Sequence, residues 1–359
     1  MIALPPLALY IHVPWCVRKC PYCDFNSHQA VGDLPVAAYV QALLANAAQQ
    51  VERAQSRTID TIFIGGGTPS LLPASAYATL FDGLQQLYRF ADDIEITLEA
   101  NPGTVEQDKF RAYRELGINR LSIGIQSFSP EKLQALGRIH GRDEALRAAE
   151  AARVSGFDNF NLDLMHGLPN QSLEEAMADI EQAIALGPTH LSWYQLTIEP
   201  NTVFYRDPPA LPEDEILWDI QEAGQERLAA AGFAQYEVSA YAQIGRQCRH
   251  NRNYWEFGDY LAIGAGAHGK LTDVNGVFRF NQTRLPKDFL AAIDGGEFTA
   301  QSGYVRDEEL AFEFMLNALR LKEGVDAALF ESRTRLPYAK IETVVEGLRT
   351  RGLLVQEKS

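Results

Sequence analysis

The chain has 359 residues, of which 46% are hydrophobic and 22% are charged, and its formal net charge is −15. No apolar run approaches the roughly 20 residues that a membrane-spanning helix requires, so we expect no transmembrane segment. The acidic charge argues against nucleic acid as the main partner, because phosphate binding requires a basic face.

The first predicted strand runs directly into a cluster of cysteines. Alternating apolar residues over 7–13 predict the strand, and Cys16, Cys20 and Cys23 follow it at C-x3-C-x2-C spacing. The residues before the strand lack a basic start and a cleavage site, so we expect no targeting signal. Four cysteines, three of them clustered, are typical of a reducing cytosol and predict a cytoplasmic protein.

Three thiolates so close in sequence can each bind one iron of a 4Fe–4S cluster and leave the fourth iron open. Zinc is an alternative, with His12 or His28 as a further ligand, but structural zinc usually takes four ligands in two separated pairs. A disulfide framework requires an even set of cysteines and an oxidising compartment. The spacing therefore favours a cluster with one iron available to a small chelating molecule.

Strand-like and helix-like segments then alternate with the period of βα units. Further strands are predicted at 61–64, 94–100, 120–125, 159–165 and 190–196, and helices at 36–54, 74–88, 106–116, 130–136, 143–154, 172–186 and 212–231. Six such units predict an α/β fold in which a parallel sheet curls into a partial TIM-like (βα)6 barrel. In barrels of this kind the loops after the strands carry the chemistry.

The period ends near residue 235. An edge strand is predicted at 236–241, a polar and aromatic loop at 248–258, helices at 307–321 and 338–351, and a last strand at 353–355. We therefore predict three parts: a barrel over 1–235, a connecting region over 236–300 and a small C-terminal helical domain over 301–359.

The cysteine motif, with Tyr22 before its last cysteine, resembles the signature of the radical S-adenosylmethionine superfamily. This resemblance implies a radical SAM barrel and a 4Fe–4S cluster whose open iron is chelated by S-adenosylmethionine. An electron from the reduced cluster would then give a 5′-deoxyadenosyl radical. The resemblance further implies that the cofactor site is lined by Tyr10, Tyr22, Gly66, Gly67, Thr68, Glu99, Gln126, Arg138 and Asp163.

These side chains suit the cofactor's functional groups. Arg138 can pair with a carboxylate, while Glu99 and Asp163 can accept hydrogen bonds from an ammonium or from ribose hydroxyls. The glycine run at 65–67 lets the backbone approach a ligand closely, although a tight turn would also explain it. For any one of the polar residues, a surface salt bridge or a helix cap is the alternative.

Longer motifs resemble the oxygen-independent coproporphyrinogen III oxidase group over nearly the whole chain. They read YIHVPWC, CPYCDF, GGGTPS, LEANP, SIGIQSF and NLDLMHGLP. Two features depart from the oxidase: Phe25 stands where the oxidase has a further cysteine, and the first strand follows without a long arm. Both differences bear on the oxidase reaction, so we do not expect coproporphyrinogen oxidase activity.

The segment His250–Trp255 matches the H-N-x-x-Y-W motif of the oxidase-like HemW group, whose members are heme chaperones. In that resemblance His250 offers an imidazole to heme iron, while Tyr254 and Trp255 offer flat apolar faces to the porphyrin. The alternative is that these side chains only pack between the barrel and the C-terminal domain.

Three arginines and a cysteine in and next to this segment also bear on heme binding. Arg246, Arg249 and Arg252 form a local basic cluster suited to propionates, unless they are simply solvated. Cys248 is either a second heme contact or a buried thiol.

The sequence thus predicts a heme chaperone that binds a 4Fe–4S cluster, S-adenosylmethionine and heme, and transfers heme to acceptor hemoproteins, including those of a respiratory chain. The alternatives are an oxygen-independent coproporphyrinogen III oxidase and a zinc-stabilised scaffold without a redox role. No catalytic residue is assigned, because the residues leave open whether S-adenosylmethionine is turned over.

Overall fold

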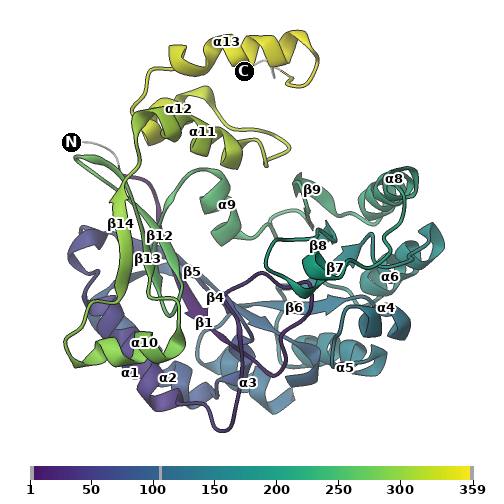
Figure 1. Ribbon diagram of the computed structural model, residues 1–359, viewed down its shortest axis with the longest axis horizontal. Coiled ribbons are helices and arrows are strands. Elements are labelled where there is room, and N and C mark those ends of the chain that lie inside the picture. Colours follow the sequence, from purple (N-terminus) through teal and green to yellow (C-terminus); the bar gives the residue numbers. More distant parts are fainter. Residues whose placement is uncertain (1–3, 105–106, 356–359) are drawn as a thin grey trace.

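A single twelve-stranded sheet organises the described part of the chain (Figure 1), and two further short strands pair separately from it. The structure is a computed structural model that describes residues 4–104 and 107–355. The strands are β1 (Leu7–Val13), β2 (Trp15–Cys16), β3 (His28–Gln29), β4 (Thr58–Gly66), β5 (Arg89–Ala100), β6 (Arg120–Gln126), β7 (Phe160–His166), β8 (His190–Gln195), β9 (Ala234–Glu237), β10 (Ala240–Ala242), β11 (Asp259–Ile263), β12 (His268–Asp273), β13 (Gly276–Gln282) and β14 (Thr299–Tyr304).

The helices are α1 (Val36–Ala48), α2 (Ala74–Leu87), α3 (Gln107–Glu115), α4 (Pro130–Ala135), α5 (Arg142–Val154), α6 (Leu173–Ala185), α7 (Val203–Arg206), α8 (Asp214–Ala230), α9 (Arg249–Trp255), α10 (Pro286–Ala291), α11 (Asp307–Ala318), α12 (Ala327–Thr334) and α13 (Ala339–Thr350). The helix predicted over 106–116 corresponds to α3, and its first residue, Glu106, lies outside the described residues.

The predicted partial (βα)6 barrel is confirmed. Strands β1, β4, β5, β6, β7 and β8 lie side by side in chain order, and every neighbouring pair is parallel. Strand β6 is buried along its whole length, which is the pattern of a parallel strand covered on its outer face by helices. Figure 1 shows those helices around the lower and outer side of the sheet.

Both edges of this sheet are extended. The single strand predicted at 236–241 is instead a hairpin of β9 and β10, with its turn at 238–239, and β10 pairs with β8 at the sheet edge. At the other edge β11 adds parallel to β1, and β12, β13 and β14 continue as an antiparallel meander. The meander was not predicted, and it makes most of the connecting region an extension of the barrel sheet.

Two local predictions are wrong. The loop predicted over 248–258 contains helix α9, because the carboxylate of Glu95 on β5 accepts hydrogen bonds from the first backbone N–H groups of the helix, at Arg249 (3.2 Å) and His250 (3.1 Å). A helix N-terminus requires such acceptors. The strand predicted at 353–355 is absent from the described chain, since Gly352, at φ +71°, turns the backbone after α13 and Leu353 stays exposed.

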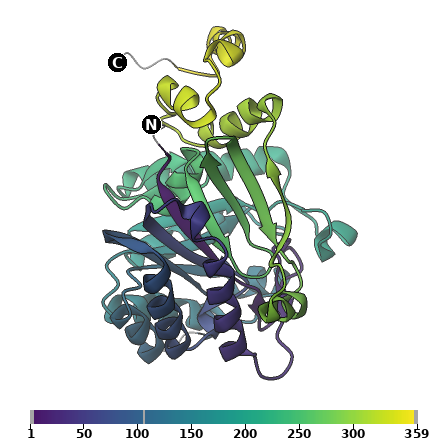
Figure 2. The same cartoon turned by 90° about the vertical axis from the view of Figure 1, so that its left-hand side faces the viewer.

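The C-terminal helices have a hydrophobic core of their own. Phe314 of α11 and Phe330 of α12 pack edge to face, and Phe257 joins them from the end of α9. Figures 1 and 2 both show α11, α12 and α13 at one end of the molecule, next to the β12–β14 meander (Figure 2). The division at residues 235 and 300 stays a prediction. No helix in the described ranges is long and apolar enough to span a bilayer.

Burial lowers the pKa of all seven histidines. It falls to about 4 in His12, His140 and His166 and to about 3 in His250. Between these pKa values and about pH 6.5, the histidines of the unfolded chain bind protons that the buried histidines of the folded chain do not bind. The free energy of unfolding therefore falls as the pH drops.

Each strongly shifted histidine contributes up to about 1.4 kcal/mol per pH unit to this loss. Glu99 and Asp179 act in the opposite direction, because burial raises their pKa to about 8 and about 6. The strongly shifted histidines outnumber them, so we expect a net loss of stability in acid. Urea unfolding of the chain at pH 7, 6 and 5 measures it, and equal stability at the three values would contradict the prediction.

Candidate functional site

A cavity of about 560 Å³, here called the cysteine cavity, opens at the carboxyl ends of the parallel strands. Its wall contains every predicted cluster and cofactor residue except Tyr10, namely Cys16, Cys20, Tyr22, Cys23, Gly66, Gly67, Thr68, Glu99, Gln126, Arg138 and Asp163. The topology explains this gathering, since the ends of neighbouring parallel strands and the loops that follow them meet at one edge of the barrel.

The three cysteines are half-buried free thiols. Cys16 ends β2, whereas Cys20 and Cys23 lie in the loop that follows, where the Cys23 N–H donates to the Cys20 carbonyl at 3.2 Å. Burial raises the pKa of the Cys16 and Cys23 thiols, so binding of a metal has to displace their protons. Ser27 Oγ lies 3.7 Å from Cys23 Sγ.

No three Cys, His, Asp or Glu side chains in the described ranges are grouped closely enough to hold one metal ion. Thiolates that share a single zinc must all lie within about 2.3 Å of it. Three thiolates at separate corners of an iron–sulfur cluster do not need this grouping, because each binds a different iron. Three free thiols in the wall of one cavity match the three protein ligands of such a cluster.

Arg138 lies beside the thiols. Its Nη1 donates to Cys20 Sγ at 3.6 Å, and its Nη2 donates to Asn101 Oδ1 at 2.7 Å and to the Gly124 carbonyl at 2.8 Å. Its Nε is buried without a partner, and within the described chain the guanidinium forms no ion pair, so the surface salt bridge considered above is not what holds it. The guanidinium is therefore held in place beside the Cys20 sulfur by neutral acceptors.

The glycine run makes room for other parts of the protein. A Cβ at Gly66 (φ +115°) would lie 2.5 Å from the His12 ring, and one at Gly67 would lie 2.5 Å from the Trp15 carbonyl oxygen. The N–H groups of Gly67 and Thr68 donate to the carbonyls of Val13 and Trp15, both at 2.7 Å. The run therefore fixes the start of the cysteine loop against β4, and these two amides are not free for a ligand.

Two partly buried carboxylates, Glu99 and Asp163, face the same cavity, and neither forms an ion pair with a described side chain. The Glu99 carboxylate accepts from the Gly66 N–H at 3.1 Å, and burial followed by repulsion from Asp163 raises its pKa to about 8. Asp163 accepts from Asn161 Nδ2 (2.8 Å) and Ser122 Oγ (3.1 Å), and burial raises its pKa. A ligand that carries an ammonium, a sulfonium and ribose hydroxyls would bring positive charge and hydrogen-bond donors next to both carboxylates.

Gln126 ends β6 in the left-handed region, at φ +69°, where non-glycine residues are uncommon. Its Oε1 accepts a hydrogen bond from Tyr194 OH at 2.9 Å. The sequence reading missed Tyr194 and Ser192, which both line the cavity from β8. The signal that could have identified them is that both are polar side chains at alternate positions of a buried strand, and alternate positions share one face.

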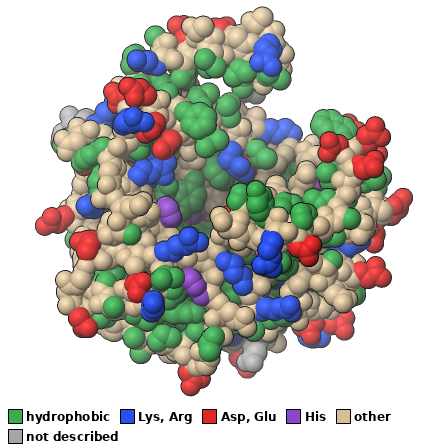
Figure 3. Space-filling model, viewed as in Figure 1, with side chains coloured by type: hydrophobic (Ala, Val, Ile, Leu, Met, Phe, Trp, Pro, Cys, Tyr) green, Lys and Arg blue, Asp and Glu red, His purple; other side chains and the backbone are tan. Residues whose placement is uncertain are grey.

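A second cavity, of about 800 Å³, adjoins the first and shares Asp24, Phe25, Gly66, Glu99 and Trp255 with it. Its other lining residues are mainly aromatic, basic and amide side chains and include Tyr10, His12, Asn26, Tyr254, Phe257, Tyr260, His268, Lys270, Arg279, Asn281, Gln282 and Arg284. Figure 3 shows the face of the molecule that is seen in Figure 1, and the middle of this face is hollowed. Basic and histidine side chains surround the hollow, whereas acidic side chains lie mainly toward the outline.

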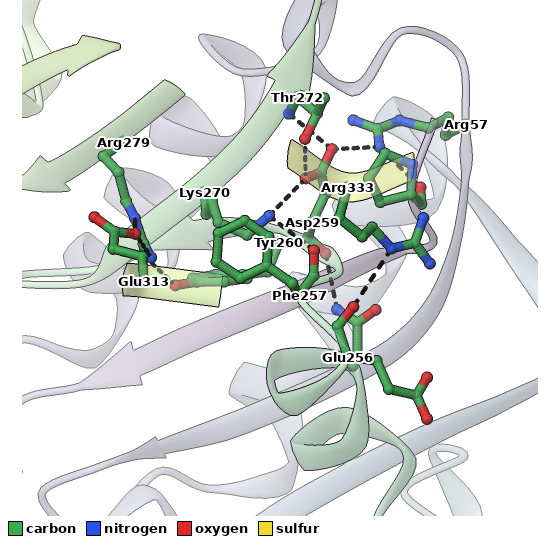
Figure 4. A network of polar contacts seen from close by, with 12 residues as sticks. Arg57, Glu256, Phe257, Asp259, Tyr260, Lys270, Thr272, Arg279, Glu313 and Arg333 are labelled. Carbon is green, nitrogen blue, oxygen red and sulfur yellow. Dashed lines mark hydrogen bonds and ion pairs between the residues drawn. The ribbon is translucent and has the colours of Figure 1, made fainter. Parts of the chain in front are cut away.

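A buried polar network around Asp259 holds one wall of the second cavity (Figure 4). The carboxylate contacts Arg57 Nη1 at 2.7 Å and Lys270 Nζ at 3.1 Å. It also accepts from the N–H and the hydroxyl of Thr272, both at 2.8 Å. The network therefore ties β12 of the meander to β11 and to the residue that precedes β4.

The predicted heme residues differ in their access to this cavity. Tyr254 and Trp255 line it, and the buried Trp255 Nε1 has no partner. His250 is fully buried, with Nδ1 hydrogen-bonded to Thr61 Oγ1 and Nε2 to Tyr254 OH, both at 2.8 Å. Both ring nitrogens are thus occupied, and in this conformation the imidazole has none left for iron.

The arginines near α9 do not form a free basic cluster. Arg246 contacts Asp158 at 3.5 Å, Arg249 contacts Asp93 at 3.2 Å, and Arg252 contacts Glu256 at 2.5 Å. Asp158 and Asp93 lie far away in sequence, so the local basic cluster in the sequence did not show that these arginines are paired. Cys248 is fully buried, as its alternative reading as a buried thiol required.

Comparison with known proteins agrees with this geometry. A model of the radical SAM superfamily matches residues 10–183, and a model of the HemN C-terminal domain matches residues 305–359. The heme chaperone HemW of Escherichia coli (strain K12) is 56% identical over 337 residues, covering 94% of this chain and 88% of its own. The heme chaperone HemW of Haemophilus influenzae is 53% identical, covering 96% and 91%.

Among solved structures, coproporphyrinogen III oxidase (HemN) from Escherichia coli superposes with a TM-score of 0.83 and covers 99% of this chain and 85% of its own. At 22% sequence identity, this likeness shows a shared fold.

Proposed function

The chain belongs to the HemW family within the radical SAM superfamily, and from this we propose that it is a cytoplasmic heme chaperone. It holds a 4Fe–4S cluster through Cys16, Cys20 and Cys23, binds S-adenosylmethionine in the rest of the cysteine cavity, and carries heme to acceptor hemoproteins, including those of a respiratory chain.

The observation that carries this proposal is the joined pair of cavities. The cysteine cavity offers three thiols and two partly buried carboxylates that form no ion pair with a described residue, which fit a cluster and a cationic cofactor. The second cavity is larger, aromatic and basic, and it shares Glu99 and Trp255 with the first. One chain can therefore hold a flat acidic tetrapyrrole beside the cofactor.

When bound, the cluster supplies an electron at the open iron, and the chain's own residues place and shield the cofactor. Arg138 keeps a positive charge beside Cys20, and the glycine run fixes the cysteine loop to β4. Glu99 and Asp163 orient an ammonium or ribose hydroxyls, since each carboxylate is held by neutral donors only.

The oxidase alternative is less supported, because the curated relatives named above are heme chaperones. Phe25, at the position where the oxidase resemblance calls for cysteine, is 60% exposed and lines both cavities.

Anaerobic reconstitution followed by two assays tests the proposal. Heme titration is expected to show uptake of one heme per chain, and incubation with an apo-cytochrome is expected to move that heme to the acceptor. Coproporphyrinogen III with S-adenosylmethionine and a reductant is expected to remain unchanged by mass spectrometry. A decarboxylated tetrapyrrole product, or failure to take up heme, would contradict the proposal.

A further inference from the structure

The strand register of the meander places one set of side chains on the wall of the second cavity. His268 and Lys270 of β12 pair directly with Asn281 and Arg279 of β13, and Lys270 also pairs with Tyr260 of β11. Directly paired residues share a face of a sheet, and alternate residues return to it. All five residues line the cavity, so the meander presents a continuous polar and aromatic face to it.

His268 is the accessible imidazole of this wall. The other histidine in the lining, His12, is hydrogen-bonded through Nδ1 to Tyr10 OH and through Nε2 to the Asn26 carbonyl, both at 2.9 Å. His268 is exposed, and its ring nitrogens have no hydrogen-bond or ion-pair partner in the part of the chain that the structure describes.

The cationic side chains of the second cavity differ in whether a carboxylate already forms an ion pair with them. Lys270 is paired with Asp259 at 3.1 Å, and Arg279 is paired with Glu313 at 2.5 Å. Arg284 is exposed and donates from Nε to Asn26 Oδ1 at 3.2 Å, and it has no carboxylate partner among the described residues. An anionic ligand can therefore bind Arg284 without breaking an existing ion pair.

Aromatic rings supply the flat apolar surface that a porphyrin requires. Tyr254 and Tyr260 pack edge to face with their centroids 4.5 Å apart, and Trp255 and Phe257 continue the lining. A volume of about 800 Å³ lies within the range of sites for small molecules and cofactors. The cavity thus combines an open imidazole, an unpaired guanidinium and aromatic surface, which match the iron, a propionate and the ring of a heme.

We propose that heme binds in the second cavity with His268 as an axial ligand of its iron and with Arg284 on a propionate. This inference rests on the proposed heme-carrying function, and it assigns the iron to a histidine outside the His250–Trp255 motif. Tyr254 and Trp255 contribute aromatic surface, while His250 holds Tyr254 in place through its hydrogen bond.

Heme titration of the full, anaerobically reconstituted chain tests this site by absorption spectroscopy. His268→Ala is expected to shift the Soret band and to weaken heme binding about tenfold or more. Added imidazole is expected to restore the wild-type spectrum, because it can occupy the vacated axial position. Arg284→Gln is expected to weaken binding several-fold with an unchanged Soret band.

Arg89→Gln is the matched control for Arg284→Gln, since Arg89 is an exposed arginine that lines neither cavity. It should bind heme as the wild type does, and all variants should keep the wild-type circular dichroism. A wild-type spectrum and affinity in His268→Ala would overturn this site and leave the heme-carrying function standing. Absence of heme uptake by the wild-type chain would overturn the function and the site together.

Discussion

Replacing Cys16, Cys20 or Cys23 by alanine is expected to remove nearly all iron and acid-labile sulfide from the reconstituted protein. Each thiol would bind a separate iron, and the described residues offer no spare cysteine in the cavity to replace a lost one. Cys248→Ala is the matched control, because its thiol is fully buried away from the cysteine cavity, against Glu95. Iron and sulfide assays on the four single variants measure the effect.

Two outcomes would contradict the cluster assignment. A variant at one of the three cysteines that keeps its full iron and sulfide content would show that another ligand serves the cluster. A wild-type chain that binds zinc in place of iron and sulfide would favour the scaffold alternative. Zinc has no redox role and would leave the purified protein colourless.

Asp259→Ala is expected to lower the free energy of unfolding by about 3–5 kcal/mol, the typical cost of breaking a buried ion pair. Asp259 is fully buried, and its loss would leave Lys270 buried without a counterion and Arg57 without its carboxylate partner. Burial already lowers the pKa of Lys270 to about 8, even with Asp259 beside it. Urea unfolding at neutral pH measures the change.

Glu150→Ala provides the control for Asp259→Ala. Glu150 pairs with Arg153 on the surface of α5, where both side chains are more than half exposed. Pairs of this kind are worth about 0–1 kcal/mol. Equal losses of stability in the two variants would contradict the claim that the Asp259 network holds the meander to the barrel.

The sequence predicted the barrel because its strands are short, apolar and regularly spaced, and the parallel topology then determines where their ends meet. The resemblance to the radical SAM superfamily assigned Cys16, Glu99, Arg138 and Asp163 to one site, and the barrel topology explains why residues so far apart in the chain line one cavity. The meander beyond residue 258 escaped prediction, since its strands add to the edge at β1 through contacts that no local pattern encodes.

The predicted heme residues also depend on contacts that no local pattern encodes. A local motif indicated His250, but Thr61 and Tyr254 occupy its two nitrogens, and Thr61 lies on a distant strand. His268 carried no local motif and became a candidate only when β12 and β13 were seen to face the second cavity. The residues that occupy the nitrogens of a histidine can be distant in sequence, so the folded structure decides which nitrogens remain available to a ligand.

The central claim is that one corner of a three-cysteine cluster stays open for S-adenosylmethionine. Electron paramagnetic resonance of the reduced, reconstituted chain, recorded with and without S-adenosylmethionine, tests it most directly. We predict a 4Fe–4S signal whose g values change when the cofactor is added, because its amino and carboxylate groups would bind the open iron. An unchanged signal at saturating cofactor would contradict the claim.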